Sequence, residues 1–194
     1  MDYGASDLRE RVEVLELAET EAGWAWTPAR ETWAGVEVTD KTNLFSKVGI
    51  GARDVTLVLR AQGLTLGHAL RWRGRHLFLT GLTETRRGWL DGRAALVDPV
   101  ECRGDVHLET PGKVFPGVLT EKYVGQERAV LTEKHVKREP MTTHITSYIL
   151  VTPKAIALRR GGVVWVEGEL FAVQTAHRLD PHKNEYEVIR KDDL

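Results

Sequence analysis

The sequence predicts an all-β protein: two small β-barrel or sandwich modules in tandem, each with a long loop or short helical insertion. Three observations support this prediction. Short runs with alternating apolar and polar residues recur along the chain, glycine-containing turns separate them, and both halves show the same order of strands and turns. Many short strands with turns at regular spacing are typical of barrels and sandwiches.

The first predicted strand covers residues 8–17. Val12 and Val14 alternate with charged residues, and the alternation slips by one position at Leu15. A slip of this kind indicates a β-bulge. A helix is the competing interpretation, because Leu, Arg and Glu favour helices. The alternating β-branched residues favour the strand.

A turn-like stretch follows at residues 19–29, with Gly23 and Pro28 as breaks. Beyond it, residues 32–38 alternate again and predict the strand that returns from a hairpin. The first strand and this one therefore form the first expected pair.

Residues 39–54 lack a clear periodicity and predict a long loop. Loops of that length in a compact domain are usually functional. The rest of the first half predicts a strand at 55–60, a hairpin at 69–82 with its tight turn at Gly74, and a last strand at 93–100.

The second half follows the same order. It predicts a strand at 147–152, a hairpin at 163–173 that turns at Gly168, and a closing strand at 185–189. A charged segment at 121–143 lies where the first half has its long loop. Both a helix and a mobile arm agree with the composition of this second insertion.

The two halves align when Gly74 is matched to Gly168. Apolar positions then coincide on both sides of the turn: Leu70 with Val164, Trp72 with Val166, Leu77 with Phe171 and Leu79 with Val173. The charged turn residues change sign, from Arg73 and Arg75 to Glu167 and Glu169. Any two all-β domains share some hairpins with a glycine turn, which is the alternative to a tandem duplication. We predict a duplication, with modules at residues 1–104 and 105–194, because turn residues cluster near the boundary.

Composition excludes several classes of protein. The 194 residues include 27 basic and 28 acidic residues, whereas proteins that coat duplex DNA usually have a basic excess. No apolar run is long enough for a membrane helix, and the first residues lack the features of a signal peptide. The single cysteine, Cys102, excludes a disulfide framework within one chain and predicts a buried small apolar residue.

Motifs for catalysis are missing from the sequence. It has neither a glycine-rich phosphate loop nor a Gly-x-Ser-x-Gly elbow, and its 7 histidines are scattered. His177 and His182 flank Asp180, where a metal site is the alternative to a simple polar loop. We therefore expect no enzymatic activity, no cofactor and no metal.

A basic and aromatic cluster marks the hairpin of the first half. Its members are Arg71, Arg73, Arg75, Arg86, Arg87, Trp72 and Trp89. Nucleic-acid phosphates, a solvated hairpin tip, and an interface with the acidic turn of another module are three interpretations. We favour the interface, because Arg and Trp are enriched in subunit contacts.

Three segments of the first half, in this order, resemble the head-closure proteins of tailed bacteriophages, also called head-tail joining or stopper proteins. The segments are Leu8-Arg9-x-Arg11-Val12-x-Val14, Thr32-Trp33-Ala34-x-Val36 and Leu70-Arg71-Trp72-Arg73-Gly74-Arg75-His76-Leu77-Phe78-Leu79-Thr80-Gly81. The resemblance covers about residues 7–101. Here His76 to Leu79 stands where the family often has a Tyr and an Ile. Family chains are usually one such domain long, so the second half is a departure that looks like a divergent copy without the opening motif.

The resemblance implies a structural role in assembly. It implies a ring at the phage neck that joins head to tail and closes the portal channel after DNA packaging. The implied partners are other copies in a ring of six or twelve chains, the portal or an adaptor ring, and the tail terminator or tail tube. Packaged DNA would pass through without sequence specificity, with no membrane involved. The implied location is the virion, after assembly in the host cytoplasm.

Ten residues are candidates for subunit contacts or for the channel surface. They are Asn43, Leu44, Phe45, Lys47, Arg71, Arg73, Arg75, Lys122, Arg128 and Lys134. The alternative function is an oligonucleotide-binding β-barrel, in which Trp72 and Trp89 would stack on bases and the arginines would contact phosphates.

Overall fold

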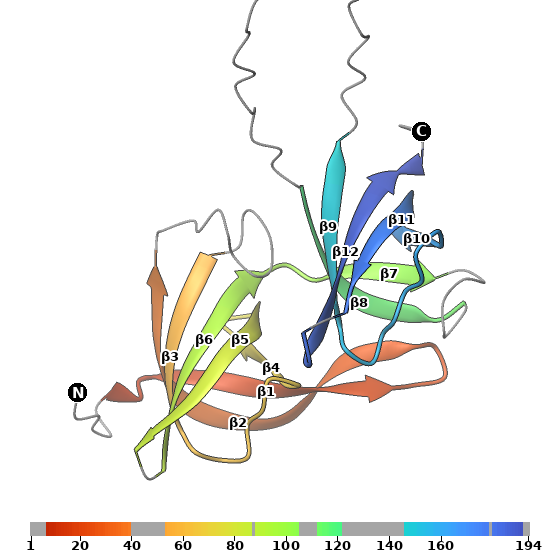
Figure 1. The fold of residues 1–194 in the computed structure, drawn as a ribbon. Coiled ribbons are helices and arrows are strands. Elements are labelled where there is room, and N and C mark those ends of the chain that lie inside the picture. The colour runs from red at the N-terminus through yellow and green to blue at the C-terminus, as the bar shows by residue number, and fades with distance from the viewer. Residues whose placement is uncertain are drawn as a thin grey trace, which may run out of the picture.

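The computed structural model describes residues 7–39, 53–86, 88–104, 112–121, 146–178 and 180–191. These residues form two closed, six-stranded antiparallel barrels in tandem and contain no α-helix (Figure 1). The predicted all-β class with two modules is confirmed.

The first barrel contains six strands in the order β1-β2-β3-β6-β5-β4 around its circumference. Their bounds are β1 (Glu10–Glu19), β2 (Trp24–Thr39), β3 (Arg53–Arg60), β4 (Ala69–Trp72), β5 (Arg75–Arg86) and β6 (Trp89–Val97). Closure occurs where β1 pairs with β4, from Val12 opposite Trp72 to Leu15 opposite Ala69.

The second barrel repeats this topology strand for strand. Its bounds are β7 (Val100–Gly104), β8 (Val114–Glu121), β9 (Ser147–Pro153), β10 (Val163–Val166), β11 (Glu169–His177) and β12 (Lys183–Arg190). Each strand has the same neighbours as its counterpart six strands earlier, so β7 takes the place of β1 and β10 the place of β4. The internal repeat is therefore a repeat of a complete barrel, including an opening strand that the sequence motif does not mark.

The boundary between the barrels lies before β7, whereas the sequence analysis predicted it after residue 104. Strand β7 pairs with β8 and β10 and therefore belongs to the second barrel. The link between barrels is short, at residues 98 and 99, between β6 and β7. The cluster of turn residues after residue 103 connects β7 to β8 within the second barrel.

The predicted first strand is confirmed, and the ladder shifts register at the predicted position, but the extra residue of the bulge lies on β2 and not on β1. Val14 pairs with Arg30 but Leu15 pairs with Pro28, so the ladder shifts register between them and Ala29 is the extra residue. Val14 and Leu15 are both fully buried although they are neighbours in sequence. The two side chains lie on opposite faces of β1: Val14 belongs to the core of the first barrel, and Leu17, on the face of Leu15, packs against the core of the second.

The predicted turn at residues 19–29 is too long. The chain turns at residues 20–23, and β2 already begins at Trp24. Pro28 lies inside β2, at the register shift, in a stretch where β2 has no pairing with β3, because that ladder begins at Ala34. A proline without a backbone N–H is tolerated at such a bulged edge, which is why it does not end the strand.

The two matched turns have the same backbone geometry. Arg73 and Gly74 have φ values of 50° and 78°, and Glu167 and Gly168 have φ values of 50° and 89°. Two consecutive positive φ values in a two-residue hairpin loop define a type I′ turn, whose twist fits that of the flanking strands. The predicted hairpins at Gly74 and Gly168 are both confirmed.

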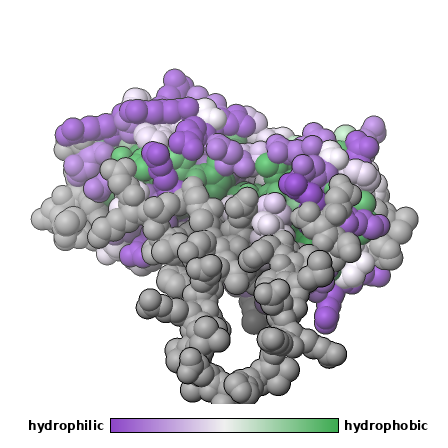
Figure 2. Space-filling view, turned by 90° about the horizontal axis from the view of Figure 1, so that it is seen from above, coloured by the Kyte–Doolittle hydropathy of each residue, from purple (hydrophilic) through white to green (hydrophobic). Residues whose placement is uncertain are grey.

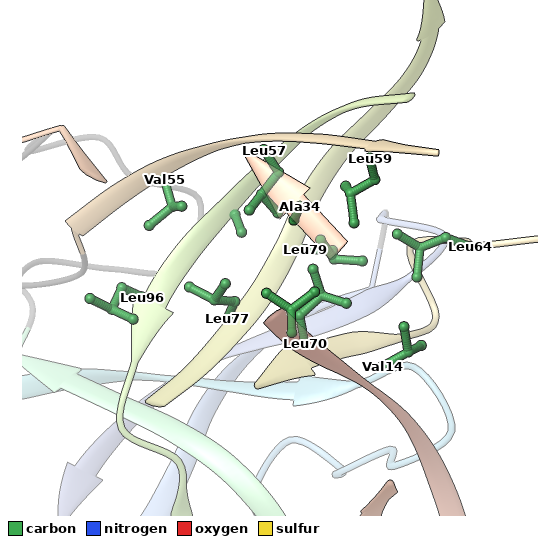
Figure 3. Close-up of a cluster of buried hydrophobic side chains, with 12 residues drawn as sticks. Val14, Ala34, Val55, Leu57, Leu59, Leu64, Leu70, Leu77, Leu79 and Leu96 are labelled. Carbon is green, nitrogen blue, oxygen red and sulfur yellow. The ribbon is translucent and has the colours of Figure 1, made fainter. Parts of the chain in front are cut away.

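Branched aliphatic side chains fill the first barrel (Figure 3). On β3, Val55, Leu57 and Leu59 alternate inward, and Leu70 of β4 and Leu77 of β5 meet them from the other side. Full burial of each such side chain contributes about 1.5–3 kcal/mol. The residues matched to these by the repeat, Val164 and Phe171 among them, fill the second barrel in the same way.

The core of the second barrel is partly aromatic. Tyr148 and Phe171 pack edge to face, with ring centroids 5.4 Å apart, and Tyr186 is fully buried. The hydroxyl oxygen of Tyr186 accepts a hydrogen bond from the backbone N–H of Leu158 at 2.9 Å, and Asn184 donates to the carbonyl of Ile156 at 3.0 Å. These bonds hold the segment between β9 and β10 over one end of the barrel.

Candidate assembly surfaces

The basic hairpin of the first barrel is paired with acidic residues of β1. Arg73 donates to both carboxylate oxygens of Glu10, at 2.7 and 3.1 Å, and Trp72 donates its indole N–H to Glu10 at 2.9 Å. Arg71 donates to Glu13 at 2.9 Å. The structure therefore anchors two of the predicted interface arginines to β1.

These contacts orient the turn without burying it. Hydrogen bonds from Arg73 and then from Trp72 lower the pKa of the Glu10 carboxyl. The Arg73 guanidinium also lies 4.8 Å from the centre of the Trp72 ring, in a cation–π contact. The side chain of Arg73 remains 66% exposed, so its outer edge faces solvent.

Sequence reasoning missed Glu10 and Glu13 as members of this cluster. Both lie in the predicted first strand: Glu13 is on the polar side of its alternation, and Glu10 is on the side of Val12, at the start of the strand. The pairing of β1 with β4 brings them to the arginines, and that long-range pairing has no local signal in the sequence. Arg75, the third predicted arginine, is less constrained, since it lies 3.9 Å from Asp98 and its side chain is 46% exposed.

The aromatic residues of the cluster are not free platforms for bases. Trp89 is only 7% exposed, and Arg60 covers its ring at 3.9 Å. Trp72 is partly buried against the core and bonded to Glu10. This arrangement disfavours the stacking role of the oligonucleotide-binding alternative, which needs exposed rings. The side chain of Arg86, and all of Arg87, lie outside the described residues.

The corresponding face of the second barrel contains a groove of about 460 Å³. It is lined by Glu101, Arg103, Trp165, Glu167 and Gly168, from β7, β10 and the turn after β10. Trp165 is 44% exposed, which is unusual for a tryptophan within a strand. Exposed tryptophan is enriched in subunit contacts, so this groove is a candidate contact surface.

Cys102 lies beneath this groove and is fully buried, as predicted. Burial raises the pKa of its thiol to about 12, and the Glu167 and Glu101 carboxylates add to the shift. A thiol of this kind is unreactive and packs as a small apolar residue.

The two barrels share an apolar contact. Phe78, Ala95 and Val97 of the first barrel pack with Val118 and Val151 of the second, and all five are at most 8% exposed. These residues lie on the outer face of their own barrels, so burial of this face depends on the other barrel.

The tip of the β1–β2 hairpin forms a second connection between the barrels. In Figure 1 this hairpin, in red and orange, extends from the first barrel beneath the second. Gly23 forms a parallel bridge with Val114, whose N–H donates to the carbonyl of Ala22 at 3.2 Å, and Lys113 forms an ion pair with Glu19. A Cβ atom on Gly23 would lie 2.0 Å from the Val114 carbonyl oxygen, so only glycine fits there.

A cleft of about 270 Å³ lies at the junction, between Trp24 and Trp26 on one side and Pro153 and Pro181 on the other. Beside it, His76 is 7% exposed and its ring packs 5.6 Å from that of Trp26. Burial lowers the pKa of His76 to about 4, with a further contribution from Arg71. The imidazole is therefore neutral near pH 7.

The histidines of the β11–β12 loop form no metal site with Asp180. Asp180 Oδ1 instead accepts the backbone N–H groups of His182, at 2.8 Å, and Lys183, at 3.2 Å, which makes it a turn-stabilising residue. Among the described residues, no group of three or more His, Cys, Asp and Glu is placed to hold a metal ion.

The remaining predicted contact residues lie outside the described part of the chain. They are Asn43, Leu44, Phe45, Lys47, Lys122, Arg128 and Lys134. The described surface seen from above is largely hydrophilic, with hydrophobic residues showing in a band between the polar areas (Figure 2). No helix of the described residues is long and apolar enough to span a membrane.

No protein-family model matches the chain, and no curated protein matches it. Among solved structures, it is similar to a chain from the virion of a native gene transfer agent (GTA) particle, with a TM-score of 0.38 and 20% sequence identity. The likeness covers 46% of this chain and 96% of that one. Less than half of this protein therefore takes part in it.

Proposed function

We propose that this protein is a structural component of a phage-like virion, where copies form a ring at the neck that joins head to tail and closes the portal channel. The placement of the head-closure-like segments carries this proposal. The opening segment forms β1, the segment around Trp33 lies in β2, and residues 70–81 form the β4–β5 hairpin. These three segments are brought together in one closed barrel.

The duplicated barrel suggests how the ring is built. Two barrels with the same topology in one chain mean that six chains present twelve similar modules. The portal ring implied by the family resemblance has twelve subunits. The proposed partners are therefore other copies of this chain, the portal or an adaptor ring on one side, and the tail terminator or tail tube on the other.

Charge and connectivity agree with a channel role. A net charge of -1 suits a protein that surrounds packaged DNA without binding it tightly. Residues 40–52 and 122–145 connect topologically equivalent strands, β2 to β3 and β8 to β9. We place the protein in virions that are assembled in the host cytoplasm.

Native mass spectrometry over a range of concentrations, with and without a purified portal ring, tests the proposal. We expect closed rings of six chains, visible by electron microscopy as rings with a central channel. Rings of twelve chains would overturn the correspondence between barrels and portal subunits. A chain that stays monomeric with the portal present and binds single-stranded DNA with a steep salt dependence would overturn the neck function in favour of the oligonucleotide-binding alternative.

A further inference from the structure

The repeat aligns the outer faces of the two barrels residue by residue. Val12 lies opposite Trp72 across the β1–β4 closure, and Cys102 lies opposite Val166 across the β7–β10 closure. With these pairs superposed, four charged positions correspond: Arg11 with Glu101, Glu13 with Arg103, Arg73 with Glu167, and Arg75 with Glu169. The charge changes sign at all four.

Opposite charges on the same backbone make the two faces complementary to each other. Contact between two first-barrel turns would bring Arg73 and Arg75 against their own copies, and contact between two second-barrel turns would do the same for Glu167. Glu169 already forms an ion pair with Arg190, at 2.7 Å. Only the contact of a first barrel with a second barrel is attractive. Like-charge repulsion suppresses the wrong pairings, so the pattern selects one partner.

The acidic face also has the features of a guanidinium site. Trp165 lies exposed in the groove, which is also lined by Glu101 and Arg103 of β7 and by Glu167 of the turn after β10. Neither carboxylate forms an ion pair with Arg103. In the described part of the chain, no cationic group lies within ion-pair distance of either carboxylate. An aromatic face with adjacent carboxylates binds a guanidinium through cation–π contact and charge-assisted hydrogen bonds.

The first barrel already contains one such grouping. There, Arg73 stacks on Trp72 and pairs with Glu10, in an arrangement of one arginine, one tryptophan and one carboxylate. Arg75, which follows the turn, lies 3.9 Å from Asp98 and has no closer acidic partner in the described part of the chain, so it is available for a contact of the same chemistry.

We infer that two copies of this chain contact each other through the Arg73–Gly74–Arg75 turn of one copy and the Glu101–Trp165–Glu167 groove of the other. The occupant of the groove is thus a second copy, chosen by charge complementarity. The contact joins unlike surfaces, and contacts of this kind build closed rings when the rotation between copies closes. The ring itself rests on the proposed function; the contact between copies does not.

Exchange of the charges at the contact tests it. One variant carries Arg73→Glu and Arg75→Glu, and the other carries Glu101→Arg and Glu167→Arg, which leaves the Glu169–Arg190 ion pair intact. At the first turn position, each barrel shows that the other's residue fits, because Arg73 and Glu167 both have a φ of 50° there. Either variant alone presents like charges at every contact, and we expect at least a tenfold weaker self-association by sedimentation velocity.

An equimolar mixture of the two variants is expected to associate again. The acidic first barrel of one variant then meets the basic second barrel of the other, and the reverse pairing is attractive as well. Chains must alternate around such a complex, so native mass spectrometry should show only even numbers of chains. A charge exchange that merely damaged each variant would not be repaired by mixing.

Arg159→Glu with Arg160→Glu is the matched control. Both arginines are exposed on a turn of the second barrel, and the pair produces the same change in net charge as the first variant. It should associate like the unmodified chain. Circular dichroism verifies folding of every variant, and the single changes Arg75→Glu and Glu167→Arg replace the double ones if these do not fold.

The possible outcomes distinguish failure of the proposed contact from failure of the proposed ring. Wild-type-like assembly of both variants, or failure of folded variants to associate on mixing, overturns the contact and leaves the ring standing. A wild-type pair of chains that is disrupted by each variant and restored by mixing supports the contact and overturns the ring. A wild-type chain that is monomeric throughout overturns the contact.

Discussion

Arg73 and Glu167 occupy the same position of the same turn, one in each barrel, and both have a φ of 50°. Residues other than glycine, asparagine and aspartate rarely adopt this left-handed conformation. The two turns therefore share a strained backbone conformation, although the charge of the side chain at this position differs in sign. The strain is present in both turns, and substitution at this position can measure its cost in stability.

Replacement of Glu167 by asparagine should stabilise the second barrel. Asparagine followed by glycine is the preferred pair for a type I′ turn, and the expected gain in the free energy of unfolding is about 0.5 kcal/mol. Urea unfolding measures it. Glu167→Gln is the control, because it removes the same charge without favouring a positive φ. An equal gain for both variants would mean that charge, and not the backbone, is responsible.

Gly23→Ala should separate the unfolding of the two barrels. The added Cβ would clash with the Val114 carbonyl and break the bridge between the hairpin tip and β8. We expect two calorimetric transitions in place of one, the earlier one belonging to the second barrel. Gly63→Ala is the control, since Gly63 also has a positive φ, of 70°, but has no atom within 4 Å of an added Cβ. A single transition in Gly23→Ala, shifted no further than in the control, would contradict this role.

Cys102 should report the opening of the second barrel. Its thiol is fully buried and its pKa is raised to about 12, so a thiol reagent at pH 8 meets neither an accessible sulfur nor a thiolate. Labelling of the native chain is expected to be slower than labelling in denaturant by about a thousandfold or more. Gly23→Ala should accelerate native labelling. Fast labelling of the unmodified chain would show that β7 is accessible.

His76 should make stability depend on pH between about 4 and 6.5. The folded pKa is lowered to about 4, so in this interval the unfolded chain binds a proton that the folded chain does not. Stability therefore falls as pH decreases from 6.5 to 4 and levels off below, with a total loss on the order of 3 kcal/mol. His76→Phe keeps an aromatic ring against Trp26 and should flatten this part of the curve. Parallel curves for both chains would show that His76 does not titrate differently on folding.

The sequence was sufficient for the strands whose patterns are local. Alternation identified β1 and the position of its register shift, and the two glycine turns aligned the halves correctly, including the residues of both cores. Pairing between strands that are distant in the sequence could not be predicted, and the boundary between the modules was misplaced for this reason. Strand β7 has only five residues and no motif, so its membership of the second barrel depends on its partners β8 and β10.

The same limit applies to the candidate surface. The arginines of the β4–β5 hairpin were found because their spacing is local. Their partners Glu10 and Glu13 lie more than fifty residues earlier in the chain, and barrel closure alone brings them near. The exposure of Trp165 was not predicted. It lies in a strand of apolar residues, where the sequence does not show which face of the strand is exposed.

The shared hairpin also sets an order for biosynthesis. Leu17 and Trp24 leave the ribosome among the first residues of the chain, yet the core against which they pack includes Tyr186 and Val188, which leave among the last. The first barrel has all of its strands long before this, so it can close while the apolar tip of its hairpin still lacks a partner. Domains that fold during translation do so from the N-terminus onward. The tip is thus a surface for chaperones until the last strand is made, and release of a chain truncated within β12 would leave it uncovered.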